Sequence, residues 1–283
     1  MEIRRPDGGV VAVEVVGAPE ATPVLLCHGL ADSRLAARRF AAAADEFGRR
    51  VIAPDRPGTG GTSARRLDRV VDWVEDATHV LDALDIAGAQ VLGVSGGGAF
   101  AAACAARSPE RFPRLVLDTP LGPPEWSTNG MAPWQRRSLR LGTRVPGFGG
   151  WFLARLAALG RRAPRLFFRV VTTEMPAADR QALSREDQWQ DFVAGYLEAF
   201  RQGSVGVAQD LRLLTHPWGF EPGEITVPTV IHHGDVDTTV PLAHARRFAA
   251  AIPHARLEIH PAHGHFSIPP ADVLAQPDAA SGT

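Results

Sequence analysis

Lysine is absent from this chain of 283 residues, and all 30 basic residues are arginines. Schiff-base chemistry and the lysine of a phosphate-binding P-loop are therefore excluded. Cysteine is nearly absent as well, with Cys27 and Cys104 as the only two. Each lies in an apolar stretch, which favours a small buried side chain over a disulfide or a metal ligand.

The sequence also lacks long hydrophobic runs and any excess of one charge. No stretch is long enough to span a bilayer, and the first residues carry no apolar signal core. The formal net charge is −1 and no basic patch stands out, so a nucleic-acid partner is not expected. We expect a cytoplasmic protein with no membrane partner, and the sequence leaves its oligomeric state open.

Strand and helix patterns alternate through residues 1–120 and again through 216–283. Short apolar runs predict strands at 10–16, 24–27, 50–55, 91–94, 114–118, 227–232 and 255–260. Amphipathic stretches between them predict helices at 33–47, 70–86 and 242–252. The turn at 6–9 makes the first strand part of a hairpin. This alternation predicts an α/β fold: a mostly parallel, twisted sheet with helices on both faces.

The alternation stops between residues 121 and 215, where helical patches occur without a convincing strand. Thirteen of the 20 aromatic residues lie within 121–220. We predict a helical cap inserted into the core, which consists of 1–120 and 216–283. Its arginines, among them Arg136, Arg137 and Arg140, are expected to be solvated rather than to bind a carboxylate.

The end of the chain is polar and rich in proline. Only a few residues separate Pro270 from Pro277, so a long final helix is not expected. Residues 276–283 have no apolar face to bury, and we expect this tail to be dispensable for stability.

Residues 93–97 read Gly93-Val94-Ser95-Gly96-Gly97, between an apolar strand pattern and an alanine-rich helix pattern. A serine at such a sharp strand-to-helix turn has a strained backbone, and flanking glycines avoid clashes with neighbouring elements. Its hydroxyl is lifted clear of the sheet, over the positive end of the helix. Ser95 is therefore a candidate nucleophile, which needs a base, an acid and an oxyanion hole.

Five segments, in this order, resemble the α/β-hydrolase superfamily along nearly the whole chain. They are His28-Gly29, Asp55-Arg56-Pro57-Gly58-Thr59-Gly60, the segment around Ser95, Gly234-Asp235-Val236-Asp237 with Val240-Pro241, and Gly264-His265-Phe266. Residues 28–120 most resemble esterase-type and aminopeptidase-type members with a helical cap. It implies Ser95 as nucleophile, His265 as base and Asp237 as the acid that orients it. The implied oxyanion hole is formed by the backbone N–H groups of Leu30 and Gly96.

Other residues compete for these roles. Asp118 and Asp235 compete with Asp237, and we expect both to cap loops or helices instead. His263 competes with His265, whereas His28 is expected to orient a loop. A metal site is a further alternative, built from Asp235, Asp237 and five histidines: His232, His233, His260, His263 and His265. No ligand pair has the tight helical spacing of a metal motif, so no metal or other cofactor is expected.

These features predict a cofactor-independent serine hydrolase, carboxylesterase-like, acting on a small and apolar ester, thioester, lactone or amide. The aromatic cap favours medium-chain or aromatic acyl groups. The same triad serves carbon–carbon bond hydrolysis or acyl transfer, which the sequence does not separate. A non-catalytic receptor on a hydrolase fold is the alternative from another class.

Overall fold

The computed structural model describes residues 1–133, 136 and 148–275. Within them, strands form one eight-stranded sheet in the order β1-β2-β4-β3-β5-β6-β7-β8. The strands are β1 (Glu2–Arg4), β2 (Val10–Val16), β3 (Thr22–Cys27), β4 (Arg49–Pro54), β5 (Gln90–Val94), β6 (Leu115–Asp118), β7 (Thr229–Gly234) and β8 (Ala255–His260). The β1–β2 hairpin and the β2–β4 pair are antiparallel, and all other pairs are parallel. The predicted α/β sheet is confirmed.

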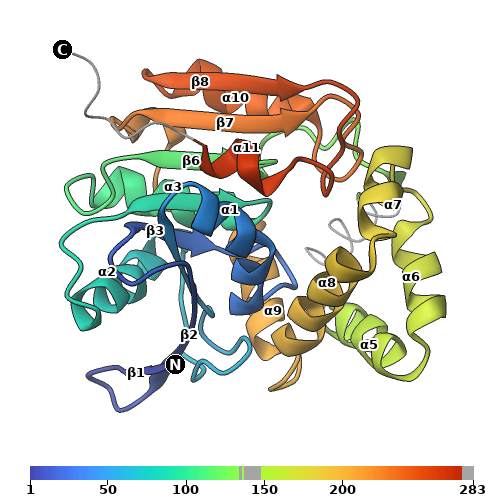
Figure 1. The fold of residues 1–283 in the computed structure, drawn as a ribbon, viewed down its shortest axis with the longest axis horizontal. Helices are drawn as coiled ribbons and strands as arrows, with labels where there is room; N and C mark the ends of the chain where they lie inside the picture. Colours follow the sequence, from blue (N-terminus) through green and yellow to red (C-terminus); the bar gives the residue numbers. More distant parts are fainter. Residues whose placement is uncertain (134–135, 137–147, 276–283) are drawn as a thin grey trace.

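Helices cover both faces of this sheet (Figure 1). One face packs against α2 (Val74–Ala83), α3 (Gly97–Arg107) and α10 (Leu242–Ala251), and the other against η1 (Arg34–Phe40), α1 (Ala41–Glu46) and α11 (Pro270–Leu274). Alternate strand residues divide between the two cores: Leu25 and Cys27 pack on the first face, Val24 and Leu26 on the second. Because side chains alternate along a strand, both faces of β3 are buried, which explains its continuous apolar run.

Two predicted helices are each divided in the structure. The stretch 33–47 is the 3-10 helix η1 followed by α1, and 70–86 is the 3-10 helix η2 (Val70–Trp73) followed by α2. Arg34, at the start of η1, donates its backbone N–H to Asp55 Oδ1 at 2.6 Å. This contact joins residues 21 positions apart, and it adds to the local N-cap at Ser33, whose hydroxyl oxygen accepts the N–H of Leu35 at 3.3 Å.

The described residues from 148 to 214 are mainly helical. They form α5 (Phe148–Arg162), α6 (Pro164–Thr172), α7 (Ala177–Leu183), α8 (Glu186–Ala199) and α9 (Val205–Leu214). Helices α5 to α8 lie beyond the arrowheads of β7 and β8, at the right of Figure 1. Phe167, Tyr196 and Phe200 belong to a separate apolar cluster of this helical segment. Trp134, Arg137 and Arg140, with the tail 276–283, lie outside the described residues.

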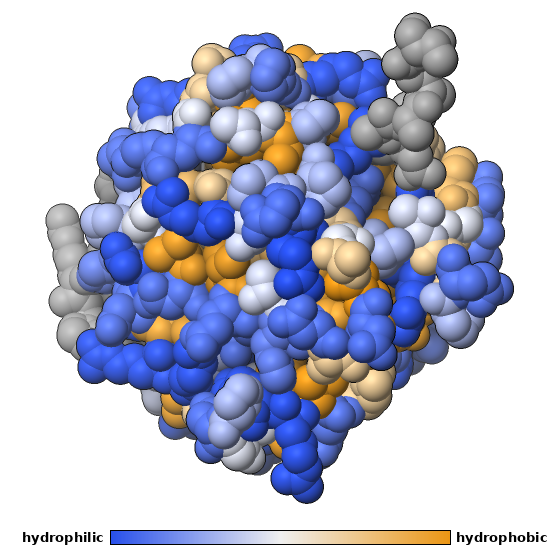
Figure 2. Space-filling model, turned by 90° about the vertical axis from the view of Figure 1, so that its left-hand side faces the viewer, coloured by the Kyte–Doolittle hydropathy of each residue, from blue (hydrophilic) through white to orange (hydrophobic). Residues whose placement is uncertain are grey.

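The face of the molecule opposite the helical segment, at the amino ends of the parallel strands, is mostly hydrophilic (Figure 2). Hydrophobic residues show there only in narrow strips between polar ones. The short helix α11 has five residues, as the proline-rich sequence predicts, and packs Val273 and Leu274 into the core beside α1. No helix within the described residues is long and apolar enough to cross a bilayer.

Arg56 connects the loop after β4 to α9 through a buried ion pair. Its side chain is fully buried and donates to Asp210 Oδ2 at 2.8 and 2.9 Å. It also donates to the carbonyl oxygens of His28 at 2.7 Å and Gly29 at 2.9 Å, while the guanidinium lies 4.3 Å from the centre of the Phe100 ring. This one side chain therefore fixes the backbone after β3 and docks α9 on the core.

Asp210→Ala leaves the Arg56 guanidinium buried without its counter-charge. We expect a loss of about 3–5 kcal/mol in the free energy of unfolding, because an unpaired buried charge keeps its desolvation cost. Denaturant unfolding measures this loss. Asp82→Ala is the matched control, since it removes an exposed partner of Arg111 and should cost about 1 kcal/mol or less. Equal losses would contradict the anchoring role of Arg56.

Candidate active site

Ser95 follows β5 and has a left-handed backbone, with φ of 55°. Two glycines explain why the turn has to be this tight. A Cβ on Gly97 would lie 2.0 Å from the carbonyl oxygen of Cys27, and one on Gly93 would lie 2.6 Å from the Cα of Gly98. Both distances are far below any real contact, so the sequence pattern reflects the close approach of α3 to β3 and β5.

His265 lies between Ser95 and Asp237. Its Nδ1 is 2.8 Å from Asp237 Oδ2, and its Nε2 is 2.9 Å from Ser95 Oγ. With Nδ1–H donating to the carboxylate, Nε2 is left as the acceptor for the serine hydroxyl. This arrangement is able to take a proton from Ser95 while the carboxylate stabilises the imidazolium that forms. The three residues that the sequence predicts as a triad are brought together.

The carboxylate of Asp237 is held by its own loop. Its Oδ1 accepts the backbone N–H groups of Thr239 at 2.7 Å and Val240 at 2.9 Å. This leaves Oδ2 directed at His265. His233 is buried behind the loop, where its Nε2 donates to the carbonyl oxygen of Val240 at 2.9 Å. The turn that follows β7 therefore orients the acid.

Charge around the imidazole outweighs its burial. Burial alone lowers the pKa of His265, but the nearby carboxylates of Asp237, Asp179 and Asp118 raise it above the ordinary value of 6.5. The imidazolium is therefore stabilised by three acidic groups that reach it from three different elements. A neutral His265, as a base requires, forms only as the pH rises through this raised pKa.

The backbone N–H groups of Leu30 and Gly96 belong to two segments that lie side by side next to Ser95. The position of a Cβ on Gly96 would lie 3.3 Å from the nitrogen of Leu30, so the loop after β3 and the start of α3 are adjacent. Among the residues that the structure describes, neither N–H has a hydrogen-bond acceptor. Paired donors at a helix N-terminus are able to stabilise an oxyanion.

Three competing residues have other contacts. Asp235 Oδ1 accepts the N–H of Ala262 at 2.7 Å, as a loop cap. His263 Nδ1 donates to the carbonyl oxygen of Pro261 at 2.9 Å. His28 is fully buried, and its Nδ1 donates to the carbonyl oxygen of Gly29 at 3.0 Å. Burial, with the Arg56 charge, lowers the pKa of His28 well below 6.5, so it remains a neutral residue that orients the loop.

Asp118 does not cap a loop or a helix, and that expectation is wrong. Its side chain lines the same cavity as Ser95 and is only 8% exposed. Within the described part of the chain, Oδ1 has no hydrogen-bond partner. Burial raises the pKa of Asp118 to about 7, although His265 and Arg39 act against it. Asp118 ends β6, where the next residue, Thr119, turns into a left-handed conformation, and this turn leaves the carboxyl without capping geometry.

The histidines of the alternative metal site are distributed among different partners. His232 Nδ1 is 3.0 Å from His260 Nε2, while His233, His263 and His265 bond elsewhere, as described above. No three His, Cys, Asp or Glu side chains among residues 1–133, 136 and 148–275 are grouped to hold a metal ion.

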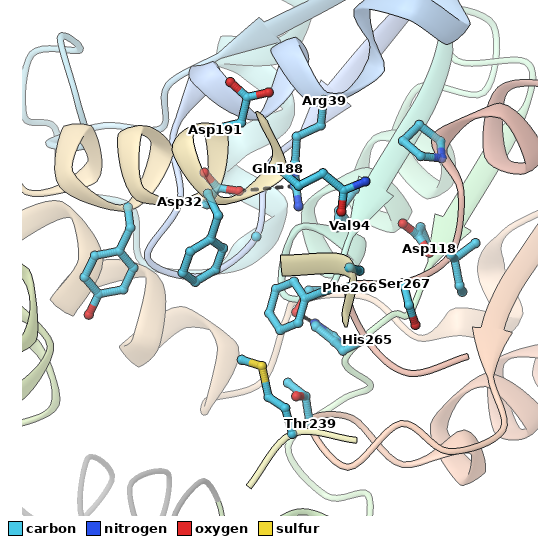
Figure 3. A pocket seen from close by; sticks show the side chains of 18 of the residues that line it. Asp32, Arg39, Val94, Asp118, Gln188, Asp191, Thr239, His265, Phe266 and Ser267 are labelled. Carbon is cyan, nitrogen blue, oxygen red and sulfur yellow. Dashed lines mark hydrogen bonds and ion pairs between the residues drawn. The ribbon is translucent and has the colours of Figure 1, made fainter. Parts of the chain in front are cut away.

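A cavity of about 1180 Å³ lies above Ser95 and His265. Apolar side chains line much of it, many from the helical segment: Leu30, Met131, Phe152, Leu153, Leu156, Val171, Met175, Phe192, Tyr196, Leu211 and Phe266. Polar residues gather in another part, where Figure 3 shows Arg39 linked to Asp32 near Gln188 and Asp191. The cavity therefore has an apolar region and a charged region, with the Ser95–His265 pair on its wall.

Arg39 and Asp179 are site residues that sequence reasoning missed. Arg39 comes from η1, and Asp179 from α7 contacts the loop of His265. Neither lies in a motif, and each is an ordinary charge on an amphipathic helix. Arg39 and Asp179 reach the site only because their helices pack against the ends of the strands.

Comparison with known proteins agrees with this fold. The profile of the alpha/beta hydrolase fold family matches residues 22–271. A 2-hydroxymuconate semialdehyde hydrolase of Pseudomonas sp. (strain CF600) is 30% identical over 280 residues, covering 92% of this chain and 89% of the relative. An enzyme of the same name from Pseudomonas putida is 32% identical over 228 residues, covering 77% and 71%. Among solved structures, a variant of the meta-cleavage product hydrolase CumD has a TM-score of 0.66 at 25% identity, covering 94% of this chain and 91% of that one.

The fold and these matches define the class of protein as an α/β-fold hydrolase, and hence an enzyme. The chain belongs to the alpha/beta hydrolase fold family.

The raised pKa of Asp118 gives a testable dependence of stability on pH. The folded state holds this proton up to about pH 7, whereas an ordinary Asp titrates near 3.8. The contribution of Asp118 to the free energy of unfolding should therefore fall as the pH rises between these values. Asp118→Asn removes the effect, so its stability relative to the native chain should rise over this interval, by at most about 4 kcal/mol.

Thermal unfolding of both proteins across this pH range measures the difference. Asp187→Asn, which changes an exposed carboxylate on α8, is the control and should show a constant offset. A constant offset for Asp118→Asn as well would mean that Asp118 titrates normally.

Proposed function

We propose that this enzyme hydrolyses a carbon–carbon bond in a 2-hydroxy-6-oxo-dienoate or a related semialdehyde, through Ser95, His265 and Asp237. The observation that carries the catalytic assignment is the continuous path from Asp237 through His265 to Ser95, with contacts of 2.8 and 2.9 Å. The bond type is supported by the relatives, which are named 2-hydroxymuconate semialdehyde hydrolases.

In the proposed mechanism, His265 takes the hydroxyl proton of Ser95, and Oγ attacks the 6-oxo carbonyl carbon. The N–H groups of Leu30 and Gly96 stabilise the resulting oxyanion. The form that is cleaved is the 2-oxo tautomer of the substrate, in which the proton of the 2-hydroxyl group has moved to C5. When the oxyanion collapses, the C5–C6 bond breaks and its electron pair is delocalised through the C3–C4 double bond onto the 2-oxo oxygen, which takes the proton from His265. Water, activated by His265, then releases the acyl group from Ser95.

A dienoate substrate carries a carboxylate, which needs a cation in the cavity. Arg39 is suited to this role because its half-buried guanidinium lies in the cavity and meets Asp32 only at 3.4 Å. A planar guanidinium binds a carboxylate through two parallel hydrogen bonds. Arg39 belongs to η1 and is not one of the cap arginines Arg136, Arg137 and Arg140, which the sequence predicts to be solvated rather than to bind a carboxylate.

We further propose the division of the chain into a core, residues 1–120 and 216–283, and a cap, residues 121–215. Helices α5, α6 and α8 contribute an apolar cluster of their own and also line the cavity. A small-molecule substrate enclosed between cap and core would be shielded from water, which strengthens electrostatic interactions at the reacting atoms.

An apolar ester is the second candidate substrate. The apolar region of the cavity favours it, because each buried methylene of an acyl chain contributes about 0.8 kcal/mol. Carboxylesterase activity and acyl transfer to an acceptor other than water use the same triad and remain alternatives to carbon–carbon hydrolysis. A non-catalytic receptor would use the cavity alone.

Ser95→Ala should abolish hydrolysis and leave the fold intact. Loss of a triad nucleophile costs on the order of a million-fold in kcat. A labelled fluorophosphonate should modify the native chain at one residue and leave the Ser95→Ala variant unlabelled. Activity of Ser95→Ala above a few per cent would contradict the assignment.

Asp237→Asn should label far more slowly than Asp118→Asn, because an amide holds His265 in the wrong tautomer, at a cost of about ten-thousand-fold.

Steady-state kinetics on two substrate series separates the two candidate functions. We expect kcat/KM for 6-methyl and 6-phenyl 2-hydroxy-6-oxo-dienoates to exceed that for p-nitrophenyl esters from acetate to decanoate. Arg39→Gln should raise KM for the dienoates by about ten-fold or more and leave KM for the esters unchanged. Arg107→Gln is the control, because Arg107 is exposed, pairs with Glu224 and is not among the described residues that line the cavity. Efficient ester cleavage without dienoate turnover would favour the carboxylesterase alternative.

A further inference from the structure

The carboxylate of Asp179 binds the loop that carries His265. Oδ2 accepts the backbone N–H of His265 at 2.8 Å, and Oδ1 accepts the N–H of Phe266 at 2.9 Å. The hydroxyl of Ser267 also donates to Oδ1, at 2.8 Å. Three consecutive residues of the loop are therefore held by one side chain that lies 86 to 88 positions earlier in the chain.

Asp179 is fully buried and comes from α7. Among the described residues no basic side chain forms an ion pair with it, so the loop donors replace water around its charge. The loop is shaped to accept it: a Cβ on Gly264 would lie 2.3 Å from Asp179 Oδ2. Burial of a carboxylate is costly without such hydrogen bonds, and here all of them go to the segment around His265.

Two carboxylates thus hold His265 from opposite ends of the residue. Asp237 binds the ring through Nδ1, and Asp179 binds the backbone through the N–H group. Fixing both ends restricts the direction in which Nε2 points, and Nε2 is the atom that faces Ser95 at 2.9 Å. Small displacements of such a base are expensive, because about 1 Å of misplacement reduces the rate by about a hundred-fold.

We infer that Asp179 is a positioning residue for the His265 base, which α7 supplies to the site from the helical segment. The inference rests on the proposed role of His265 in activating Ser95. Asp179 touches neither the substrate nor the reacting atoms, and it acts through the backbone of the loop and through its charge.

Because Asp179 is charged, its positioning role predicts an effect on the pKa of His265 that packing alone would not produce. The groups that face His265 are Asp237 from the loop after β7, Asp179 from α7, Asp118 from β6 and the neutral His233 behind the loop. The acidic groups raise the pKa of His265. Loss of the Asp179 charge should lower this pKa, and the base should then become neutral at a lower pH.

The experiment is the rate of fluorophosphonate labelling of Ser95 as a function of pH, which needs no knowledge of the substrate. For Asp179→Asn we expect the acid limb of the profile to move to lower pH by up to about one unit. The plateau rate should fall by about 10- to 100-fold. Ser267→Ala keeps the charge of Asp179 and removes a hydroxyl that donates to Asp179 and accepts the N–H of Gly264, so its rate should fall with no movement of the acid limb.

Asp82→Asn is the control, since Asp82 is an exposed carboxylate of α2 that pairs with Arg111 and, among the described residues, neither lines the cavity nor contacts the His265 loop. Its profile should equal that of the native chain. An Asp179→Asn variant that labels with the native rate and acid limb would overturn the inference, even if its Tm were lower. If that variant does not fold, an unchanged labelling rate in Ser267→Ala overturns it. A native chain that does not label at Ser95 would refute the proposed function instead.

Discussion

The close approach of the first turn of α3 to the end of β3 is the constraint on which the site depends. A Cβ on Gly97 would meet the carbonyl oxygen of Cys27 at 2.0 Å, so helix and strand pack backbone to backbone. This contact forces Ser95 into its left-handed conformation and brings the N–H of Gly96 beside that of Leu30. Arg56 holds the loop after β3, because its guanidinium donates to the carbonyl oxygens of His28 and Gly29. Ser95 and the two N–H groups proposed as oxyanion donors therefore belong to one packed unit.

The base is held in a different way, by contacts between distant parts of the chain. Its ring depends on Asp237 after β7, and its backbone depends on Asp179 in α7. The strand-end loops of a parallel sheet bring the first partner close, but the second comes from the helical segment. The orientation of His265 therefore depends on the docking of α7 on the core, because α7 carries Asp179. A second long-range contact is the ion pair between Arg56 and Asp210 of α9. Because Arg56 also binds the loop after β3, this pair connects that loop to the helical segment.

Sequence reasoning could find what local patterns encode. The strands follow from apolar runs, and Ser95, Asp237 and His265 follow from motifs at the ends of parallel strands, which the sheet must bring to one edge. It could not find Asp179, Arg39 or Asp210, because each is a charged residue on a helix and its role arises from packing across the fold. It also predicted wrongly that Asp118 caps a loop or a helix, because the burial of this side chain depends on the cavity above β6. Long-range packing is what a local pattern omits.

The connection between β6 and β7 has a consequence for how this scaffold can diverge. It runs from residue 119 to 228, yet β6 and β7 pair directly in the sheet. The entropy lost on closing such a loop grows only with the logarithm of its length, and doubling it costs about 0.6 kcal/mol. Insertions and deletions in this connection are thus cheap for the sheet. Among the positions that constrain them are Asp179, which binds the loop of His265, and Asp210, which binds Arg56. Other positions that line the cavity can therefore vary with the substrate, while anchors such as these two change only together with the groups that they bind.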